Sequence, residues 1–339
     1  MAARLLLDRD SILAFRRRVG GLDARLRHGP DSLRLAAWAG LQDSVPRAAL
    51  LSIHARVAGT GPSAWEDPSL VQLWGPRFSA YVVAAADLPV FSLGRLPEDG
   101  ARLRRAEETA DRLDAFLAGR RMPYGDAGRG LGHHGNLLRY AAPTGRVLIR
   151  WDGARQPTVW TVPAPAVPAH EARRELARRY LHVFGPATPA SFVKWAGVRP
   201  QRGRSPFDPL AAELVAVRTP IGDAWILAAD EPAFRELSGP EAPARLLPSG
   251  DAFFLLQGAD RALLVPDAAR RGELWTPRVW PGAILVAGEV AGTWRRAHAA
   301  VTLQAWRPLS PAEREAVEEE ATSLPLPDLA RAISVAWTD

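Results

Sequence analysis

The chain has 339 residues, of which 47% are apolar and 24% are charged, and its formal net charge is +6. This length exceeds one ordinary core, so we expect two to four compact units, and the composition excludes a disordered chain. No cysteine occurs, which excludes disulfides, thiolate nucleophiles and cysteine-bound zinc or iron–sulfur sites.

Residues 1–100 are expected to form a first unit of three helices followed by a β-ribbon. Asp10 is a candidate N-cap for the first helix and Asp31 or Ser32 for the second, and Pro46 fits the first turn of the third. A further short helix is expected over DPSLVQLW and a strand over RFSAYVVAA. Helices followed by a β-ribbon is the order of a winged-helix unit.

The same order recurs in two further units, residues 101–165 and 166–238. The first of these begins with an amphipathic helix over 101–122 and ends in a hairpin formed by RVLIRWD and PTVWTV. Between them, GDAGRGLG is expected to be a flexible loop, since no nucleotide-binding context surrounds it. The other unit has a helix beginning at His170, a second helix capped by Thr188, and another hairpin.

Residues 239–339 have a different pattern, with short β-like runs separated by Gly and Pro turns and followed by an acidic helix near 310–322. We predict a C-terminal antiparallel β domain. The fold class is therefore α+β, with three tandem winged helix-turn-helix modules ahead of that β domain.

The stretch GLQDSVP contains three polar side chains, Gln42, Asp43 and Ser44, between two helical patterns. Asp43 and Ser44 shortly precede Pro46, which is a good place for a helix N-cap, and Gln42 can then simply end the preceding helix. The alternative is that Gln42 orients a water molecule for chemistry, because an amide accepts and donates hydrogen bonds at once. For Ser44 the capping interpretation is favoured.

Several segments together resemble the AlkZ-like DNA glycosylase family of winged-helix proteins. They are GLQDSVPRAALLSIHARV, LWGPRFSAYVVAAADLP, YLHVFGPATPASFVKWAGV and LLPSGDAFFLLQGADRALLVP with the later GAILVAGEVAGTWRR. The resemblance implies tandem winged helices around a basic channel for duplex DNA. It also implies removal of bases alkylated at guanine N7, bulky adducts and crosslinks included, which in some members protects antibiotic producers from their own product.

The resemblance also implies a catalytic position. The family's signature is two glutamines that flank one residue, or a glutamine and an aspartate in the same arrangement. In this sequence Gln42 matches the first position, Asp43 lies between, and Ser44 stands at the second. Gln42 is thus expected to orient the attacking water, with Asp43 assisting as a carboxylate, and Ser44 is the departure from the family pattern.

Arginine carries almost all of the positive charge, because Lys194 is the only lysine. Arginine suits phosphate, although a GC-rich genome explains its abundance equally well. The loop histidines of GHHGN and nearby arginines can be DNA contacts, or simply solvated side chains. The candidate DNA-binding residues are His133, His134, Arg129, Arg139, Arg150, Arg155 and Arg77.

The expected partner is duplex DNA containing alkylated bases, with no cofactor, no metal and no obligate protein partner. No apolar run is long enough to span a membrane and no signal-peptide pattern begins the chain, so we expect a cytoplasmic monomer with no membrane association. The single lysine argues against lyase chemistry, so the enzyme is expected to be a monofunctional glycosylase. The alternative is a non-catalytic winged-helix DNA-binding protein or regulator, which the departure at Ser44 favours.

Overall fold

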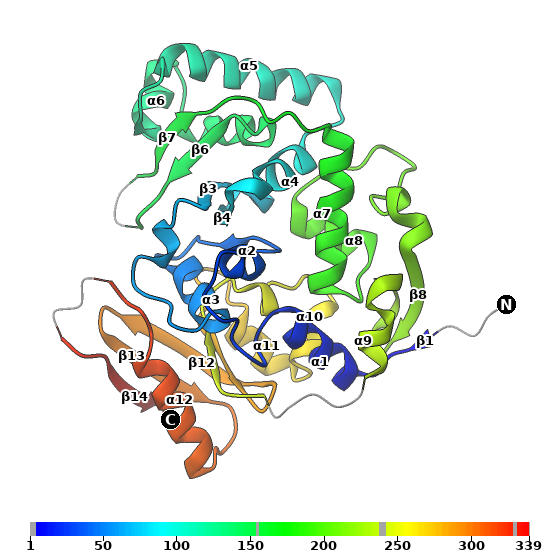
Figure 1. The fold of residues 1–339 in the computed structure, drawn as a ribbon, viewed down its shortest axis with the longest axis vertical. Coiled ribbons are helices and arrows are strands. Elements are labelled where there is room, and N and C mark those ends of the chain that lie inside the picture. The colour runs from blue at the N-terminus through cyan, green and yellow to red at the C-terminus, as the bar shows by residue number, and fades with distance from the viewer. Residues whose placement is uncertain (1–4, 154–155, 237–241, 328–330, 339) are drawn as a thin grey trace.

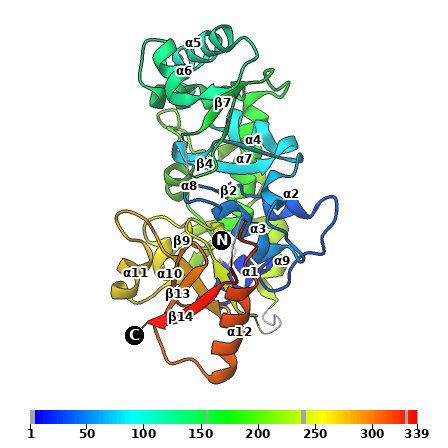
Figure 2. The same cartoon turned by 90° about the vertical axis from the view of Figure 1, so that its left-hand side faces the viewer.

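Four β-sheets and the helices between them build the molecule. The computed structural model describes residues 5–153, 156–236, 242–327 and 331–338. In Figures 1 and 2 the helices α5 (Gly100–Leu117) and α6 (Tyr124–Gly130) lie at one end of the molecule. The helix α12 (Pro311–Thr322) and the C-terminal sheet lie at the other end.

The first sheet has the strand order β2-β4-β3, with β4 antiparallel to both neighbours. The elements of this part of the chain are α1 (Arg9–Val19), α2 (Ser32–Ala36), β2 (Leu41–Gln42), α3 (Ala48–Arg56), β3 (Leu70–Trp74), β4 (Ala80–Ala84) and α4 (Leu88–Ser92). Three details of the sequence prediction are wrong here.

The first helix is capped by Asp8 rather than Asp10, since the Asp8 carboxylate accepts from the Ser11 backbone N–H at 2.7 Å. The predicted short helix over DPSLVQLW contains instead the strand β3, whose residues are mostly buried and pair with β4 along its whole length. The helix α3 begins at Ala48 and not at Pro46, because Arg47 has a left-handed φ of 68°.

The second sheet has the order β5-β7-β6 and contains the predicted hairpin of β6 (Val147–Arg150) and β7 (Thr158–Thr161), beside β5 (Met122–Pro123). The prediction of a loop over GDAGRGLG is wrong, because most of this segment belongs to α6. Its glycines permit close packing: a Cβ at Gly128 would lie 2.5 Å from Gly135, and one at Gly130 would lie 2.1 Å from the Phe116 ring.

The third sheet joins distant parts of the chain. The predicted helices are α7 (Ala169–Phe184) and α8 (Pro189–Ala196), and Thr188 caps α8 by accepting from the Ser191 backbone N–H at 3.1 Å. The hairpin of β8 (Leu214–Thr219) and β9 (Gly222–Leu227) follows, then α9 (Glu231–Arg235). The short strand β1 (Leu5–Leu6) pairs in parallel with β8, so the start of the chain packs on this unit.

The C-terminal sheet has the order β10-β11-β12-β13-β14. Its elements are β10 (Arg245–Leu247), α10 (Asp260–Leu264), α11 (Ala268–Leu274), β11 (Gly282–Val286), β12 (Glu289–Ala297), β13 (Ala300–Ala305), α12 and β14 (Ser334–Thr338). The prediction of an antiparallel sheet is wrong at one edge, where β14 is parallel to β13. The intervening α12 returns the chain to the same end of the sheet, as parallel crossovers require.

Short 3₁₀ helices complete the fold: Ala64–Glu66, Pro76–Phe78, Ala85–Asp87, Leu93–Arg95, Gly135–Thr144, Asp208–Glu213, Ala228–Asp230 and Ala252–Phe254. In the first two sheets, a short early strand pairs with the second strand of the following hairpin, whereas in the third sheet β1 pairs with the first strand. The interpretation as three winged-helix modules stays a prediction, and so do the unit limits.

A single large core joins all four parts of the chain. It contains Tyr81 from the first sheet, Leu148 from the second, Trp195 from α8 and Phe254 from the C-terminal part. Because apolar burial is shared in this way, the parts hold one another in place.

A buried ion pair adds a polar link across this core. The guanidinium of Arg56, on α3, donates to both carboxylate oxygens of Asp251 at 2.7 and 2.8 Å. Their side chains are only 4% and 0% exposed. Burial alone would raise the pKa of Asp251, but the Arg56 charge and the hydrogen bonds from Arg56, Phe253 and Ser52 outweigh it and lower that pKa.

Breaking this pair should destabilise the protein strongly. Arg56→Met leaves the Asp251 carboxylate buried without its counter-charge, so we expect the free energy of unfolding to fall by about 3–5 kcal/mol in urea titrations. The matched control is Arg218→Met, whose ion pair with Asp223 is exposed on both sides and should contribute at most about 1 kcal/mol. Equal losses in the two variants would contradict the role given to the buried pair.

Candidate functional site

Gln42 is half-buried and ends the two-residue strand β2, where it pairs with Tyr81 of β4. Its side-chain Oε1 accepts from Nη2 of Arg77 at 3.1 Å, and the Tyr81 hydroxyl makes a longer contact of 3.5 Å. Burial raises the pKa of Tyr81 to about 12, so its hydroxyl stays protonated at neutral pH. The amide is therefore oriented by a cationic donor and faces a neutral hydroxyl.

The other side of the Gln42 amide rests against the C-terminal part of the chain. A Cβ built on Gly250 would lie 2.9 Å from Nε2 of Gln42, and Gly250 has a φ of +77°, which also favours glycine. The next residue is Asp251, held by the buried Arg56 pair. The glycine thus permits the turn at 248–251 to approach Gln42, and the ion pair fixes the turn there.

Asp43 lies immediately behind Gln42 and is only 1% exposed. One carboxylate oxygen accepts from the Ala49 backbone N–H at 3.0 Å, so Asp43 caps α3, as the capping alternative supposes. The other oxygen accepts from Nε2 of Gln72 at 2.7 Å. Burial raises the pKa of Asp43 to about 6, against the opposing effect of these hydrogen bonds and of nearby arginine charges.

Ser44 is exposed, and its hydroxyl makes no hydrogen bond within the described ranges. The expectation that Ser44 caps the following helix is wrong, because the Asp43 carboxylate and not the Ser44 hydroxyl accepts from the first turn of α3. Ser44 also does not contact Gln42 through a hydrogen bond among the described residues.

Gln72 was not expected from the sequence, and it links two units at this point. Besides donating to Asp43, its Oε1 accepts from the Trp151 backbone N–H at 2.5 Å, which belongs to the turn after β6. The β6–β7 hairpin is therefore attached directly behind the Gln42 strand. Sequence reasoning missed it because Gln72 lies in a segment that was predicted to be a helix.

Several arginines lie near Gln42 and Asp43. Arg47 and Arg150 both stack on the Trp65 ring, with 4.2 and 3.7 Å from guanidinium carbon to ring centroid. Arg150 also forms an ion pair with Glu66 at 2.7 Å, so part of its charge is already neutralised. Arg296 donates to the Pro46 carbonyl at 3.0 Å, close to Arg47.

Arg77 sits in a strained turn between β3 and β4. Arg77 and Phe78 both have left-handed φ values, 55° and 58°, which are costly for residues with a Cβ. The turn is backed by Gly197, where a Cβ would lie 3.0 Å from the Arg77 backbone. Arg77 also approaches Arg261, whose pKa is lowered by burial and by the Arg77 charge. This conformation directs Arg77 toward Gln42.

The candidates Arg129, His133, His134 and Arg139 lie on α6, in the 3₁₀ helix Gly135–Thr144 or between the two. In Figures 1 and 2, α6 lies at one end of the molecule and α3 lies nearer the middle. His134 accepts from the Asn136 backbone N–H at 3.1 Å through Nδ1 and so caps that 3₁₀ helix, and Nδ1 of His133 lies 3.3 Å from the His134 carbonyl. The structure therefore does not bring these histidines next to Gln42.

Two arginines of this region already have partners. Arg129 forms an exposed ion pair with Asp126, and Arg139 donates to Oδ1 of Asn136 at 2.6 Å. Arg155 lies outside the described residues. DNA contact by any of these side chains stays a prediction.

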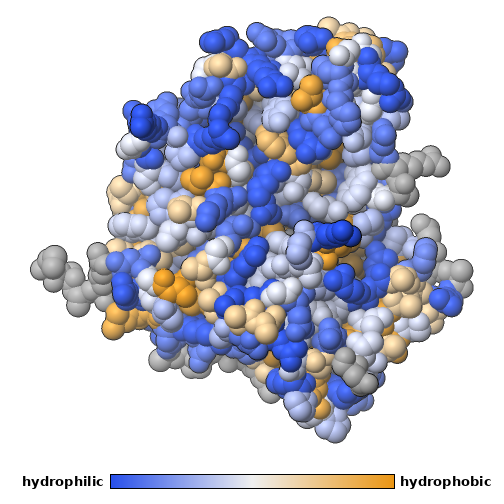
Figure 3. All heavy atoms as spheres, turned by 180° about the vertical axis from the view of Figure 1, so that it is seen from behind, coloured by the Kyte–Doolittle hydropathy of each residue, from blue (hydrophilic) through white to orange (hydrophobic). Residues whose placement is uncertain are grey.

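The described part of the chain contains no group of three or more His, Cys, Asp or Glu side chains that could hold a metal ion, and no helix there is long and apolar enough to cross a membrane. On the face seen in Figure 3, apolar residues form small separate patches between hydrophilic ones.

Comparison with known proteins defines the class of this one. A family model described as "DNA glycosylase AlkZ-like" matches residues 35–325. The chain therefore belongs to the AlkZ-like DNA glycosylase family, which confirms the resemblance found in the sequence and supports a DNA glycosylase of DNA repair.

The fold agrees with this membership. The solved structure of the Streptomyces sahachiroi DNA glycosylase AlkZ is similar, with a TM-score of 0.77 and 18% identity. The match covers 98% of this chain and 100% of that chain. At this identity the likeness shows the shared fold alone. No curated protein matches the chain.

The raised pKa of Asp43 predicts a specific pH dependence of stability. The folded state holds the Asp43 proton more tightly than the unfolded state, so this residue's contribution to stability falls as pH rises from the ordinary aspartate pKa of 3.8 toward about 6. Asp43→Asn does not titrate. From about pH 4 to about pH 7 the variant should therefore gain about 2 kcal/mol relative to the native protein.

Urea unfolding at these two pH values measures the difference directly. Any fixed cost of the substitution, such as an amide N–H facing the Gln72 amide, cancels between them. A difference that is the same at both pH values would contradict a raised pKa for Asp43.

Proposed function

We propose that this protein hydrolyses the N-glycosidic bond of N7-alkylated guanine in duplex DNA. The single observation that carries the proposal is the Gln42 amide, which lies at the family's first catalytic position and is held between Arg77 and Gly250. Bulky genotoxic natural-product adducts and crosslinks belong to the same substrate class, and their removal would serve self-resistance.

The chemistry asks little of the protein. An N7-alkylguanine is already cationic, so when the bond to C1′ breaks, the base leaves with the electron pair as a neutral molecule. The sugar passes through an oxocarbenium-like state, water adds to C1′, and the water proton passes to solvent. What the enzyme must supply is a positioned water and tolerance of positive charge on the sugar.

Gln42 supplies the position. An amide oxygen has two lone pairs: Arg77 takes one of them at 3.1 Å, and the Tyr81 hydroxyl makes a long contact of 3.5 Å with the oxygen, which a water molecule can replace. Arg77 therefore acts as a positioning residue that keeps Oε1 aimed in one direction. This adds to the phosphate contact that the sequence predicts for Arg77.

Asp43 assists from behind. With both carboxylate oxygens bonded to Ala49 and Gln72 and only 1% exposure, it acts on the sugar through its charge rather than by contact. A pKa of about 6 leaves it mostly ionised at neutral pH. The negative charge then lies one residue from Gln42 in a partly buried setting, where charges interact more strongly than in water.

The reaction is proposed to stop at the abasic site. Lys194 is the only lysine of the chain, and its exposed ammonium lies near Gly258, in a pocket whose lining includes Asp260 but not Gln42. A Schiff base to the sugar at Gln42 has no lysine to form it, so we propose a monofunctional glycosylase.

Incubation of the protein with a duplex carrying one N7-methylguanine tests this function. The native protein should release the free base, and Gln42→Ala should slow single-turnover release by about 100-fold, because a mispositioned water loses the benefit of orientation. Gln304→Ala, which removes an equal amide from β13, is the matched control and should retain the native rate. The rate of base release by Ser44→Ala, measured in the same assay, shows how much the second position of the family signature contributes.

Full activity of Gln42→Ala would remove Gln42 from the mechanism. Absence of release by the native protein, from duplexes with simple and with bulky adducts, would favour the second candidate function, a non-catalytic DNA-binding protein. This second function is favoured by Ser44, which is exposed and whose hydroxyl makes no hydrogen bond among the described residues.

A further inference from the structure

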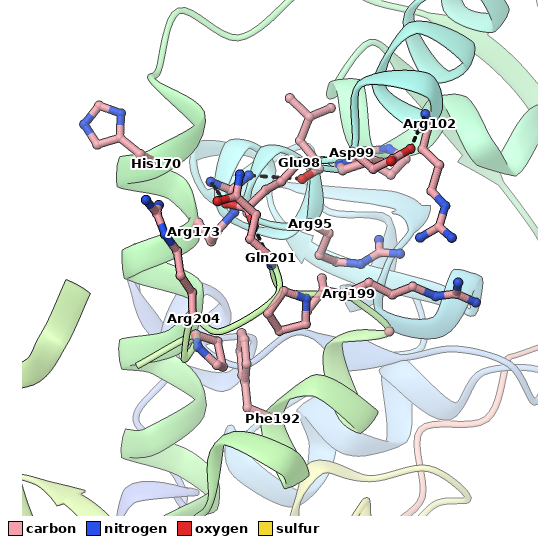
Figure 4. Close-up of a pocket in the computed structure, with 18 of the residues that line it drawn as sticks. Arg95, Glu98, Asp99, Arg102, His170, Arg173, Phe192, Arg199, Gln201 and Arg204 are labelled. Carbon is pink, nitrogen blue, oxygen red and sulfur yellow. Dashed lines mark hydrogen bonds and ion pairs between the residues drawn. The ribbon is translucent and has the colours of Figure 1, made fainter. Parts of the chain in front are cut away.

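A cavity of about 730 Å³ is lined in part by a residue of the strained β3–β4 turn (Figure 4). Arg77 reaches Gln42, whereas its neighbour Phe78 lines the cavity. Gly197, which backs Arg77, lines it as well. Arg77 and Phe78 are consecutive residues, so their Cα atoms are about 3.8 Å apart. A single turn therefore contacts both the cavity and the proposed catalytic amide.

Aromatic rings form one wall of the cavity. Phe78 and Tyr140 meet edge to face, with 5.3 Å between ring centroids and an interplanar angle of 77°. Phe192, from α8, also lines the cavity. Tyr140 is 40% exposed, and the guanidinium of Arg105 lies over its ring, 5.0 Å from the centroid, so the part of the ring that Arg105 does not cover is open to a ligand. Such rings are platforms on which a planar ring stacks.

Cations dominate the polar part of the lining, with six arginines and three carboxylates. Arg173 is paired with Glu98 at 3.3 Å. Arg102, Arg199 and Arg204 are exposed and have no carboxylate within ion-pair distance in the described part of the chain. In Figure 4 the side chains of Arg102 and Arg199 extend to the same side of the cavity. Unpaired guanidinium groups around a concave surface attract an anion.

We propose that this cavity binds one extrahelical nucleotide of the damaged duplex, with the base stacked on Tyr140 and the phosphate bound by Arg102 and Arg199, whose side chains extend to the same side. Aromatic platforms combined with arginines are the chemistry that recognises unpaired nucleotides. The volume is within the range of about 300–1,000 Å³ that suits a ligand of this size. That the nucleotide belongs to DNA rests on the proposed function, whereas the binding of a nucleotide is inferred from the side chains that line the cavity.

The first experiment titrates the protein with 2-aminopurine deoxyribonucleoside 5′-monophosphate, whose fluorescence is quenched on stacking. We expect saturable quenching, about tenfold weaker binding by Arg102→Ser and by Arg199→Ser, and about tenfold weaker binding of the nucleoside without phosphate. Tyr140→Ala should lose most of the quenching. Arg202→Ser is the matched control, since this exposed arginine belongs to the same loop as Arg199 and does not line the cavity.

All four substituted side chains are exposed, so the variants should fold, which circular dichroism checks. Absence of saturable quenching by the native protein overturns the proposal. Equal affinity of the native protein and both cavity arginine variants overturns it too.

Competition identifies the source of the nucleotide. An undamaged duplex with one bulged, unpaired nucleotide should displace the probe at concentrations about tenfold lower than a fully paired duplex. If neither duplex displaces the probe, a free nucleotide is the ligand and the DNA proposal is overturned. Base release without probe binding contradicts the cavity proposal alone, and probe binding without base release contradicts the glycosylase proposal alone.

Discussion

The buried ion pair between Arg56 and Asp251 is the interaction on which the candidate site depends. It joins α3, which follows Gln42, to the turn that carries Gly250, and both side chains are almost completely removed from water. A charge buried in this way is stable only with its partner, so the pair fixes the relative placement of two segments about two hundred residues apart. Gly250 then meets the Gln42 amide on one side while Arg77 holds it on the other.

Much of the fold followed from local pattern. The helices α7 and α8, the β6–β7 and β8–β9 hairpins and the acidic helix α12 have amphipathic or alternating sequences, and the structure confirms them. The errors occur where tertiary pairing decides. The local pattern of the β3 segment predicts a helix and the glycines of α6 predict a loop, whereas the parallel strand β14 depends on a crossover that no local pattern shows.

The site was less predictable than the fold. Family resemblance singled out Gln42 and the sequence placed Arg77 beside the strand, and the structure brings the two together. The sequence did not indicate Gly250 or Gln72, because a turn glycine and a strand glutamine have no distinctive local pattern and matter here through long-range contacts. For Asp43 the two alternatives are compatible in space: it caps α3 and lies directly behind the amide.

The central claim is that Arg77 acts on catalysis through the Gln42 amide. A double-mutant cycle tests it most directly, with single-turnover release of N7-methylguanine measured for Gln42→Ala, Arg77→Ala and the double variant. The account predicts that Arg77→Ala slows release by about tenfold in the native protein and changes it little once Gln42 is alanine. Equal effects of Arg77→Ala in both backgrounds would contradict the account and leave Arg77 as a separate DNA contact.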